Sequence, residues 1–337
     1  MDVPETSYGS DKHGLVCAYQ FGAGQGAAMV DAEQLAALLD PATGPPERFF
    51  WLHFSLSNAA SERWMRRHLS LPEAFYQAIT APTSSTRLEQ DGDALVAVIH
   101  DVLFDFTFDP ESVSTVHLCL EPRLLVTARL RPVRSVDLLR NAVRGGAPFR
   151  SPAEMLAQLL HHQANVLADI VRATTVKVDA IEDKLLADRV ATSRRELGTL
   201  RRTLVRLQRL LAPEPASLFR LLSRPPGWIG GEDVQDLRES AEEFSVAVAD
   251  AGTLVERVKL LQEELGALVG EETSRTLFVL TVVTVLALPI NLVAGLFGMN
   301  VGGIPFAAHG SGFARVVTAL ALFTVVAAWF ALGRRRE

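Results

Sequence analysis

The sequence predicts an α+β fold in which an N-terminal α/β domain is followed by long stalk helices and two C-terminal transmembrane helices. Hydrophobic residues make up 48% of the 337 residues, and the mean hydropathy of +0.19 lies above the slightly negative value usual for soluble domains. The formal net charge is −6, yet residues 276–314 and 316–333 contain no Asp, Glu, Lys or Arg. Residues 276–337 sum to +3, which leaves −9 on residues 1–275. This distribution excludes an ordinary soluble enzyme and a basic nucleic-acid binder.

Residues 1–150 have the pattern of an α/β domain. Asp91-Gly92-Asp93 predicts a tight hairpin turn between two apolar runs. Cys17 and Cys119 have no CxxC partner, which argues against a disulfide framework or structural zinc. The first thirty residues lack the basic start and apolar run that would indicate a signal peptide. We therefore expect a cytosolic domain. Strands are predicted over 15–21, 48–56, 86–90, 94–104, 113–120 and 124–128, and helices over 31–39, 61–69, 72–79 and 135–143.

Residues 151–275 are expected to form a helical stalk. Ser151, Pro152 and Glu154 form a helix start, and a proline-free run follows to Leu211. Prolines 213, 215, 225 and 226 interrupt this run. A second helix is predicted over 232–297, which at 1.5 Å per residue would be about 100 Å long and would need partners to pack against. Its heptad seam could pack within one subunit, between subunits, or both; the seam consists of Leu254, Val258, Leu261, Leu265 and Leu268.

Residues 276–337 are predicted to form the transmembrane domain. The stretches 276–297 and 313–332 are each long enough to cross the roughly 30 Å hydrocarbon core once, with 298–312 as an outer loop. The loop lacks Lys and Arg, whereas Arg334–Arg336 follow the second span, so both termini are expected to be cytoplasmic. Arg315 departs mildly from this pattern, although an arginine near a helix end can reach the interface. The alternative is a buried helical hairpin of a soluble protein.

Polar residues of the first span lie on one helical face. Apart from Thr276, every side chain there with a hydrogen-bonding group falls on a 4-3 spacing counted back from Gly298. We call this set the polar track: Ser274, Leu277, Thr281, Thr284, Leu288, Asn291 and Gly295. Because polar groups do not face lipid favourably, the track indicates a pore seen by several helices around an axis, with leucines as constrictions. The alternative is that the threonines only bond their own backbone.

The same spacing extends into the stalk and reaches four acidic residues, Glu239, Glu242, Glu256 and Glu263. In an oligomer they would form rings of carboxylates that attract cations at the inner mouth. The alternative is an ordinary solvated helix face.

At the outer end of the first span stands Gly298-Met299-Asn300, followed by Val301-Gly302-Gly303-Ile304-Pro305. The triplet, placed after a very long helix and before a second C-terminal span, resembles the signature of the CorA superfamily of divalent-cation transporters. Its glycine-rich continuation is similar to that of the ZntB zinc-transporter branch. The resemblance covers essentially the whole chain.

This resemblance implies a homopentamer with a cytoplasmic funnel of stalk helices and a central pore lined by the first span. Gly298, Met299 and Asn300 would form the outer mouth, where Asn300 meets the hydrated metal ion. Asn291 matches a second pore asparagine of the family. The loop 301–312 lacks the acidic residues usual in CorA proper, and only His309 in it can titrate. That departure favours the ZntB branch and metal collection by amides and carbonyls.

The expected function is therefore transport of divalent cations, Zn²⁺ foremost, across the inner membrane, with proton-coupled uptake implied by the resemblance. Ni²⁺, Cd²⁺, Co²⁺ or Mg²⁺ are further candidate cargoes, and no bound cofactor or nucleic-acid partner is expected. Membrane lipid and further copies of the chain are the expected partners. One alternative is a CorA-type magnesium or cobalt channel. Another is a membrane-anchored coiled-coil scaffold without transport.

Other patterns in the sequence give weaker indications of function. The glycine-rich segment 22–26 has neither dinucleotide-loop spacing nor a P-loop lysine, and we expect a loose turn between a strand and a helix. His161 and His162 are adjacent on a predicted helix, so they would not chelate one ion. We expect the strand histidines His53, His100 and His117 to be packed residues.

Overall fold

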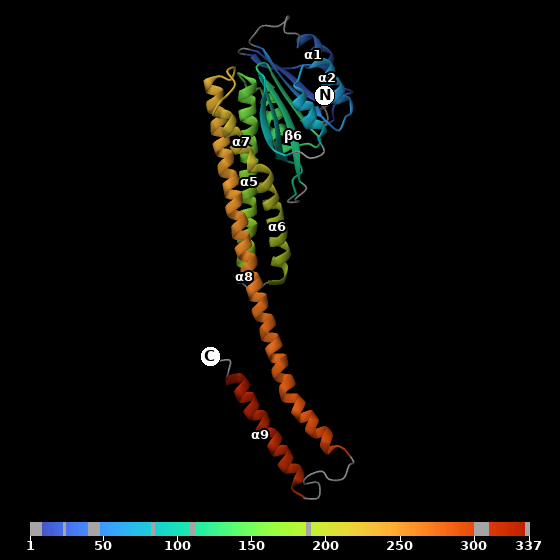
Figure 1. Cartoon of the computed structure of the whole chain (residues 1–337), viewed down its shortest axis with the longest axis vertical. Coiled ribbons are helices and arrows are strands. Elements are labelled where there is room, and N and C mark those ends of the chain that lie inside the picture. Colours follow the sequence, from blue (N-terminus) through green and yellow to red (C-terminus); the bar gives the residue numbers. More distant parts are fainter. Residues whose placement is uncertain are drawn as a thin grey trace, which may run out of the picture. The chain divides into compact units, whose positions relative to one another are not determined.

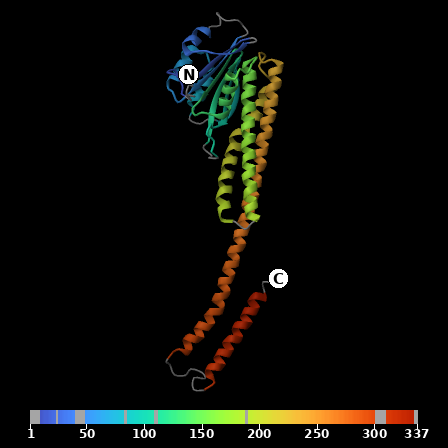
Figure 2. The same cartoon turned by 180° about the vertical axis from the view of Figure 1, so that it is seen from behind.

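The structure, a computed structural model, describes residues 9–22, 25–39, 48–81, 85–107, 112–186, 190–299 and 310–333. By their contacts the residues fall into two units, Met1–Gln262 and Glu263–Glu337. The expected division at residues 150 and 275 rests on sequence character and stays a prediction. Figures 1 and 2 show the chain from opposite sides.

A seven-stranded sheet with the strand order β2-β1-β3-β7-β6-β5-β4 forms the centre of the α/β part of the first unit. Figure 1 shows this sheet beside α1 and α2, with β6 labelled. Only β3 and β7 pair in parallel; all the other neighbouring pairs are antiparallel. Its strands are β1 (Leu15–Gly22), β2 (Gln25–Met29), β3 (Phe49–Ser55), β4 (Arg87–Asp91), β5 (Ala94–Val102), β6 (Val113–Glu121) and β7 (Leu124–Arg129).

Both faces of this sheet are covered. Every residue of β3, β5 and β7 is buried, as expected for strands between two helical layers. Alternate side chains enter two separate cores: Trp51 and Leu125 belong to one, and Leu52 and Val126 to the other. The helices of the first unit's α/β part are α1 (Ala32–Leu38), α2 (Ala60–His68), α3 (Glu73–Thr80) and α4 (Arg134–Arg144).

Six strands and four helices lie where the sequence predicts them, within about two residues, but β2 was not anticipated. The glycine-rich segment leads into β2, which pairs with β1 in a hairpin, and not directly into a helix. The expected loose turn falls on residues 23–24, outside the described residues. The missed strand, QGAAM, has no β-branched or aromatic residue, so its strand conformation depends on pairing with β1.

The stalk consists of α5 (Pro152–Leu186), α6 (Val190–Leu211), α7 (Pro213–Leu222) and the beginning of α8 (Gly231–Phe297). The predicted helix start is confirmed, because the Glu154 N–H donates to Ser151 Oγ at 3.0 Å. The proline-free run up to Leu211 forms two helices, α5 and α6, which contact each other. Folding back lets Leu167 of α5 and Leu207 of α6 share one core with Phe244 of α8.

Prolines 213 and 215 interrupt the helical run as predicted, since α6 ends at Leu211 and the next helix, α7, begins at Pro213. Both lie in the first turn of α7, where a missing N–H costs no intrahelical hydrogen bond. Prolines 225 and 226 do lie in the connection between α7 and α8, as expected.

The long helix is confirmed, since α8 runs through 67 residues and includes Pro289. Most of its heptad seam is buried within the single chain: Leu254, Val258, Leu261 and Leu265 are 5%, 0%, 6% and 0% exposed, whereas Leu268 is 40% exposed. Arg257, on the same stretch of α8, forms ion pairs with Asp179 and Glu182 of α5 at 2.7 and 2.5 Å. The second unit contains the end of α8 and α9 (Gly312–Gly333), close to the predicted spans.

Candidate functional site

The two C-terminal helices carry an apolar surface that the chain itself does not cover. Both are long and apolar enough to cross a membrane, and 0% and 6% of their most apolar windows are buried. Leu280 and Leu288 of α8 are 61% and 67% exposed, and Trp329 of α9 is 75% exposed. A buried helical hairpin of a soluble protein would hide these side chains. Apolar surface on this scale needs lipid or other protein chains.

Every member of the polar track is exposed or half-exposed within the second unit, from Ser274 to Gly295. The Asn291 amide makes no hydrogen bond to any described residue and is free to contact water, an ion or another helix. Gly298 closes the last turn of α8, its N–H donating to Ala294 O at 3.0 Å. Met299 follows with 52% of its surface exposed. Asn300, the outer loop up to residue 309 and Arg334–Arg336 lie outside the described residues.

The two track threonines present acceptor oxygens. The hydroxyl hydrogens of Thr281 and Thr284 are donated to the carbonyls of Leu277 and Leu280, each at 2.8 Å. The lone pairs of both oxygens therefore remain available to a cation or its water shell. Thr276, Thr318 and Thr324 bond their own backbone in the same way, so this geometry alone does not mark the track as a pore.

Pro289 adds a further acceptor to this stretch of α8. A proline inside a helix has no N–H, so the carbonyl four residues earlier, that of Val285, lacks its intrahelical partner. Oxygen acceptors thus come from side chains and from the backbone in the same two turns. Such groups replace or hydrogen-bond the water of a hard cation.

On the stalk part of α8, Glu239, Glu242 and Glu256 are exposed, and Glu263 is exposed in the second unit. Their local contacts are weak: Gln235 Nε2 donates to Glu239 at 2.8 Å, and Glu256 lies 3.5 Å from Lys259. Exposure of this kind fits a solvated face as well as a ring of carboxylates.

Sequence reasoning overlooked two apolar members of this same stripe. Val246 and Leu260, at the 4-3 spacing of the acidic residues, are 61% and 63% exposed. Phe244 and Val258, which lie on the opposite face of α8, are completely buried. The helix therefore has one face for its own chain and another whose large apolar side chains are unpartnered. The two faces of α8 differ in burial, since only the first is packed against the rest of the chain.

The histidines are not assembled into a metal centre. His53 Nδ1 donates to Thr127 Oγ1 at 2.7 Å while Arg129 Nε donates to His53 Nε2 at 3.0 Å, which occupies both ring nitrogens. Burial lowers the pKa of His117 to about 4. His161 Nδ1 lies 2.5 Å from Glu243, a side chain of α8. Among the described residues no group of three His, Cys, Asp or Glu side chains is placed to hold a metal ion.

The chain is similar in sequence to known proteins. The model of the CorA-like Mg²⁺ transporter protein family matches residues 46–335. The divalent cation transporter CmaX of Pseudomonas aeruginosa is 28% identical over 306 residues, covering 90% of this chain and 91% of that protein. The zinc transport protein ZntB of Yersinia enterocolitica is 24% identical over 289 residues, covering 86% and 88% of the two chains.

Two solved structures are similar to this chain in fold. The structure of full-length CmaX has a TM-score of 0.81 at 26% identity and covers 97% of this chain and 99% of that one. The CorA magnesium transporter from Methanocaldococcus jannaschii has a TM-score of 0.72 at 17% identity, with coverages of 93% and 96%. That second likeness shows the fold alone.

Proposed function

The chain belongs to the family of CorA-like Mg²⁺ transporter proteins, and on this premise we propose that it carries divalent cations, zinc foremost, through a pore lined by α8. It is a transporter of the CorA/ZntB type and not an enzyme. The relatives named as zinc transporters favour zinc as the cargo.

The observation that carries the proposal is the uncovered polar track of α8. Apart from Thr276 at its edge, the polar side chains of this span are Thr281, Thr284 and Asn291, and all three are exposed on one helical face. In a lipid environment such a face is unfavourable unless it meets water or other helices. Several copies of α8 around one axis provide both, and the family resemblance makes five the expected number.

In this arrangement each group has a chemical role. Asn300, with Gly298 and Met299, would hold the hydrated ion at the outer mouth. Farther along, the Asn291 amide and the threonine oxygens would substitute for part of the water shell. Leu277 and Leu288 are 57% and 67% exposed in the single chain. In the oligomer each would form a ring of leucine side chains that narrows the ion path. Glu239, Glu242, Glu256 and Glu263 would concentrate cations at the inner mouth.

A zinc flux assay tests this proposal. The full chain is reconstituted into proteoliposomes, and Zn²⁺ entry is followed with an internal metal-sensitive dye. We expect saturable Zn²⁺ flux that Asn300→Ala reduces by about tenfold or more, given the loss of one amide in every subunit. The matched control is Asn141→Ala, because Asn141 is exposed on α4, outside the spans. Absence of flux, or equal flux in Asn300→Ala, would overturn the proposal.

A magnesium or cobalt channel is the second candidate, and the donor set favours it. The polar track offers only amide, hydroxyl and carbonyl oxygens, with no His or Cys. Oxygen donors suit Mg²⁺, whereas nitrogen and sulfur donors are those that select Zn²⁺. The two candidates separate in a competition experiment: excess Mg²⁺ should leave Zn²⁺ flux largely intact in a zinc transporter and suppress it in a magnesium channel.

Proton coupling is a further point to test. The spans contain no Asp or Glu, and Glu271 and Glu272 are the nearest preceding acids. A pH gradient across the proteoliposome that changes the initial rate of Zn²⁺ uptake would support coupling. An unchanged rate would indicate a passive channel.

The proposed location is the inner membrane, with both termini in the cytoplasm. Labelling of single cysteines introduced at Ser7 and Glu337 in intact cells should require a membrane-permeant reagent. Labelling of either position by an impermeant reagent would contradict this topology. A scaffold that is only tethered by its spans predicts no flux at all and tolerance of Thr284→Leu and Asn291→Leu.

A further inference from the structure

A cationic pocket lies on the α/β part of the first unit, and none of the residues that line it belongs to α8. It has a volume of about 500 Å³, within the usual range for small-molecule sites. Three segments line it: the turn before β1 supplies His13, the start of α1 supplies Ala32 and Glu33, and α2 supplies the rest. The α2 residues are Ala60, Arg63, Trp64, Arg67 and His68.

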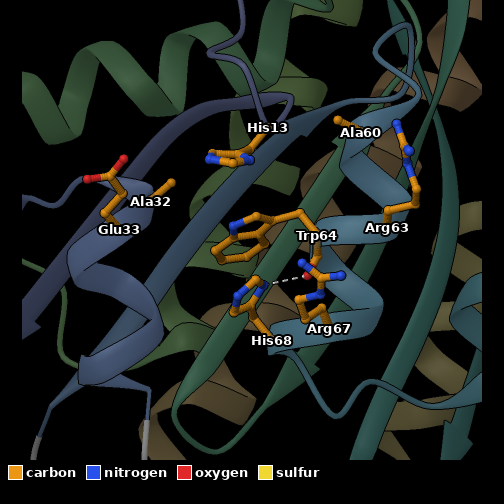
Figure 3. A pocket seen from close by; sticks show the side chains of 8 residues that line it. All are labelled: His13, Ala32, Glu33, Ala60, Arg63, Trp64, Arg67 and His68. Atoms are coloured by element: carbon orange, nitrogen blue, oxygen red, sulfur yellow. Dashed lines mark hydrogen bonds between the residues drawn. The ribbon is translucent and has the colours of Figure 1, made fainter.

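The indole of Trp64 forms the floor of this pocket. Figure 3 shows His13 on one side of the indole and His68 on the other, with Arg67 beside His68 and Arg63 at the rim near Ala60. Trp64 is only 6% exposed and stacks on the His68 ring at 4.6 Å between centroids. The floor is therefore rigid and apolar, while the groups around it are polar.

The charges of the pocket do not cancel. Arg63 and Arg67 lie four residues apart on one face of α2 and form no ion pair or hydrogen bond with the described residues. Arg66 of the same helix differs, because Glu62 and Glu73 hold it at 2.9 and 3.1 Å. Among the described residues that line the pocket, Glu33 is the one acid, and Lys12 forms an ion pair with it at 2.9 Å. Two guanidinium groups thus remain for an external anion.

The two histidines line the pocket beside the arginines. His68 Nδ1 donates to the carbonyl of Trp64 at 3.0 Å, so the other ring nitrogen, Nε2, is the acceptor of this tautomer. The backbone N–H of His13 donates to Asp11 Oδ1 at 2.8 Å, an interaction that fixes the backbone of the turn at this residue. The hydrogen-bond donors for an anion are therefore the two forked guanidinium groups, which beside an apolar floor match a phosphate group attached to a small organic body.

We propose that this pocket binds a phosphomonoester, with the phosphate held by Arg63 and Arg67 and the organic part resting against Trp64 and the histidines beside it. The shared chemistry has two sources, a soluble metabolite or the headgroup of a phosphatidic lipid. The site is independent of the proposed ion path, since its residues lie on α1, α2 and the turn before β1.

Calorimetric titration of the full chain, purified in detergent, tests the proposal. Phenyl phosphate should bind saturably and more tightly than inorganic phosphate, because only the former reaches the indole. Arg63→Gln with Arg67→Gln should weaken phenyl phosphate binding by about tenfold or more, the effect of losing charge-assisted hydrogen bonds. The control pair Arg144→Gln with Arg220→Gln removes the same charge from exposed sites on α4 and α7 and should leave binding unchanged.

Each further outcome has a defined meaning. Tighter binding of short-chain phosphatidic acid than of phenyl phosphate supports the site and identifies a lipid source; the reverse order supports it with a soluble source. Arg67→Lys, which keeps the charge and loses the fork, should give intermediate affinity. Absence of saturable binding up to about 10 mM, far weaker than a specific site requires, overturns the proposal. Equal affinity in the Arg63/Arg67 variant and the wild type does so as well.

Discussion

The carboxyl group of Glu214 accepts a hydrogen bond from the backbone N–H of His100 at 2.7 Å. It thereby joins the first turn of α7 to the middle of β5, two segments more than one hundred positions apart. Gln163 of α5 donates to the same carboxyl group at 3.0 Å and also to the His100 carbonyl. Thr86 Oγ1 lies 3.0 Å from His100 Nδ1 and donates to Leu210 O of α6 at 3.1 Å. The sheet and the stalk meet in this cluster.

The first prediction concerns pH. Burial raises the pKa of Glu214 well above its usual value of 4.5, so the folded chain retains this proton to a higher pH than the unfolded chain does. The stabilisation is complete below about pH 4.5 and is lost as the pH rises through the folded-state pKa. Within that window, stability should fall by up to ~1.4 kcal/mol per pH unit.

Glu214→Gln keeps a neutral acceptor for His100 and should flatten this pH dependence. Thermal unfolding in detergent between pH 5 and about 8, followed by tryptophan fluorescence, measures it, because Trp51, Trp64 and Trp228 all lie in the first unit. Glu89→Gln, at an exposed position of β4, controls for the formal charge change. Parallel pH profiles of wild type and Glu214→Gln would contradict the prediction.

The second prediction separates the two faces of α8. Val258 is 0% exposed and Leu260 is 63% exposed. Val258→Ala should lower the free energy of unfolding by ~1–3 kcal/mol through the cavity it leaves. Leu260→Ser should leave that free energy nearly unchanged and should instead lower the stability of the oligomer, measured as subunit dissociation by light scattering. If both variants unfolded alike and dissociated alike, the expectation that the exposed face of α8 contacts other subunits would be wrong.

The third prediction isolates the threonine oxygens. Thr284→Val keeps the shape of the side chain and removes its acceptor, so we expect a several-fold loss of cation flux, whereas Thr284→Ser should retain most of it. Thr318→Val on α9 is the matched control, since Thr318 makes the same 2.8 Å bond to its own backbone. Equal flux in Thr284→Val and Thr318→Val would remove Thr284 from the path.

The fourth prediction concerns the unpartnered amide of α8. Replacing Asn291 by Leu makes the track continuously apolar over the last turns of the span. Cation flux should fall by about tenfold or more, because no amide then compensates the ion for the water it loses. The neighbouring substitution Leu292→Ala, at a position off the track and 62% exposed, should preserve flux. A conducting Asn291→Leu protein would argue for the scaffold alternative.

The fifth prediction compares two adjacent acids, Glu263 on the track and Glu264 off it, both exposed. Glu263→Gln should lower flux about twofold at low ionic strength, and Glu264→Gln should have little effect. Salt at about 0.5 M should abolish the difference, because the Debye length then falls below the width of a funnel mouth. A difference that persists at high salt would point to direct coordination in place of field attraction.

The sequence by itself determined the features that depend on local pattern. Two uncharged stretches define α9 and the end of α8, since membrane thickness sets a length that composition can be counted against. The 4-3 spacing of Thr281, Thr284 and Asn291 follows from helix geometry alone. Gly298-Met299-Asn300 identified the family that the wider comparison bears out.

The tertiary structure decided what depends on distant partners. Strand β2 exists because β1 pairs with it, and the run from Ser151 to Leu211 divides because α6 packs back on α5. No local signal shows that Glu214 is buried, since Pro-Glu-Pro predicts only a break in a helix. The two faces of α8 are equally apolar in places, as Val258 and Leu260 show, and only packing against the rest of the chain hides one of them. Burial is a property of the surroundings, and a linear pattern contains no information about them until the chain has folded.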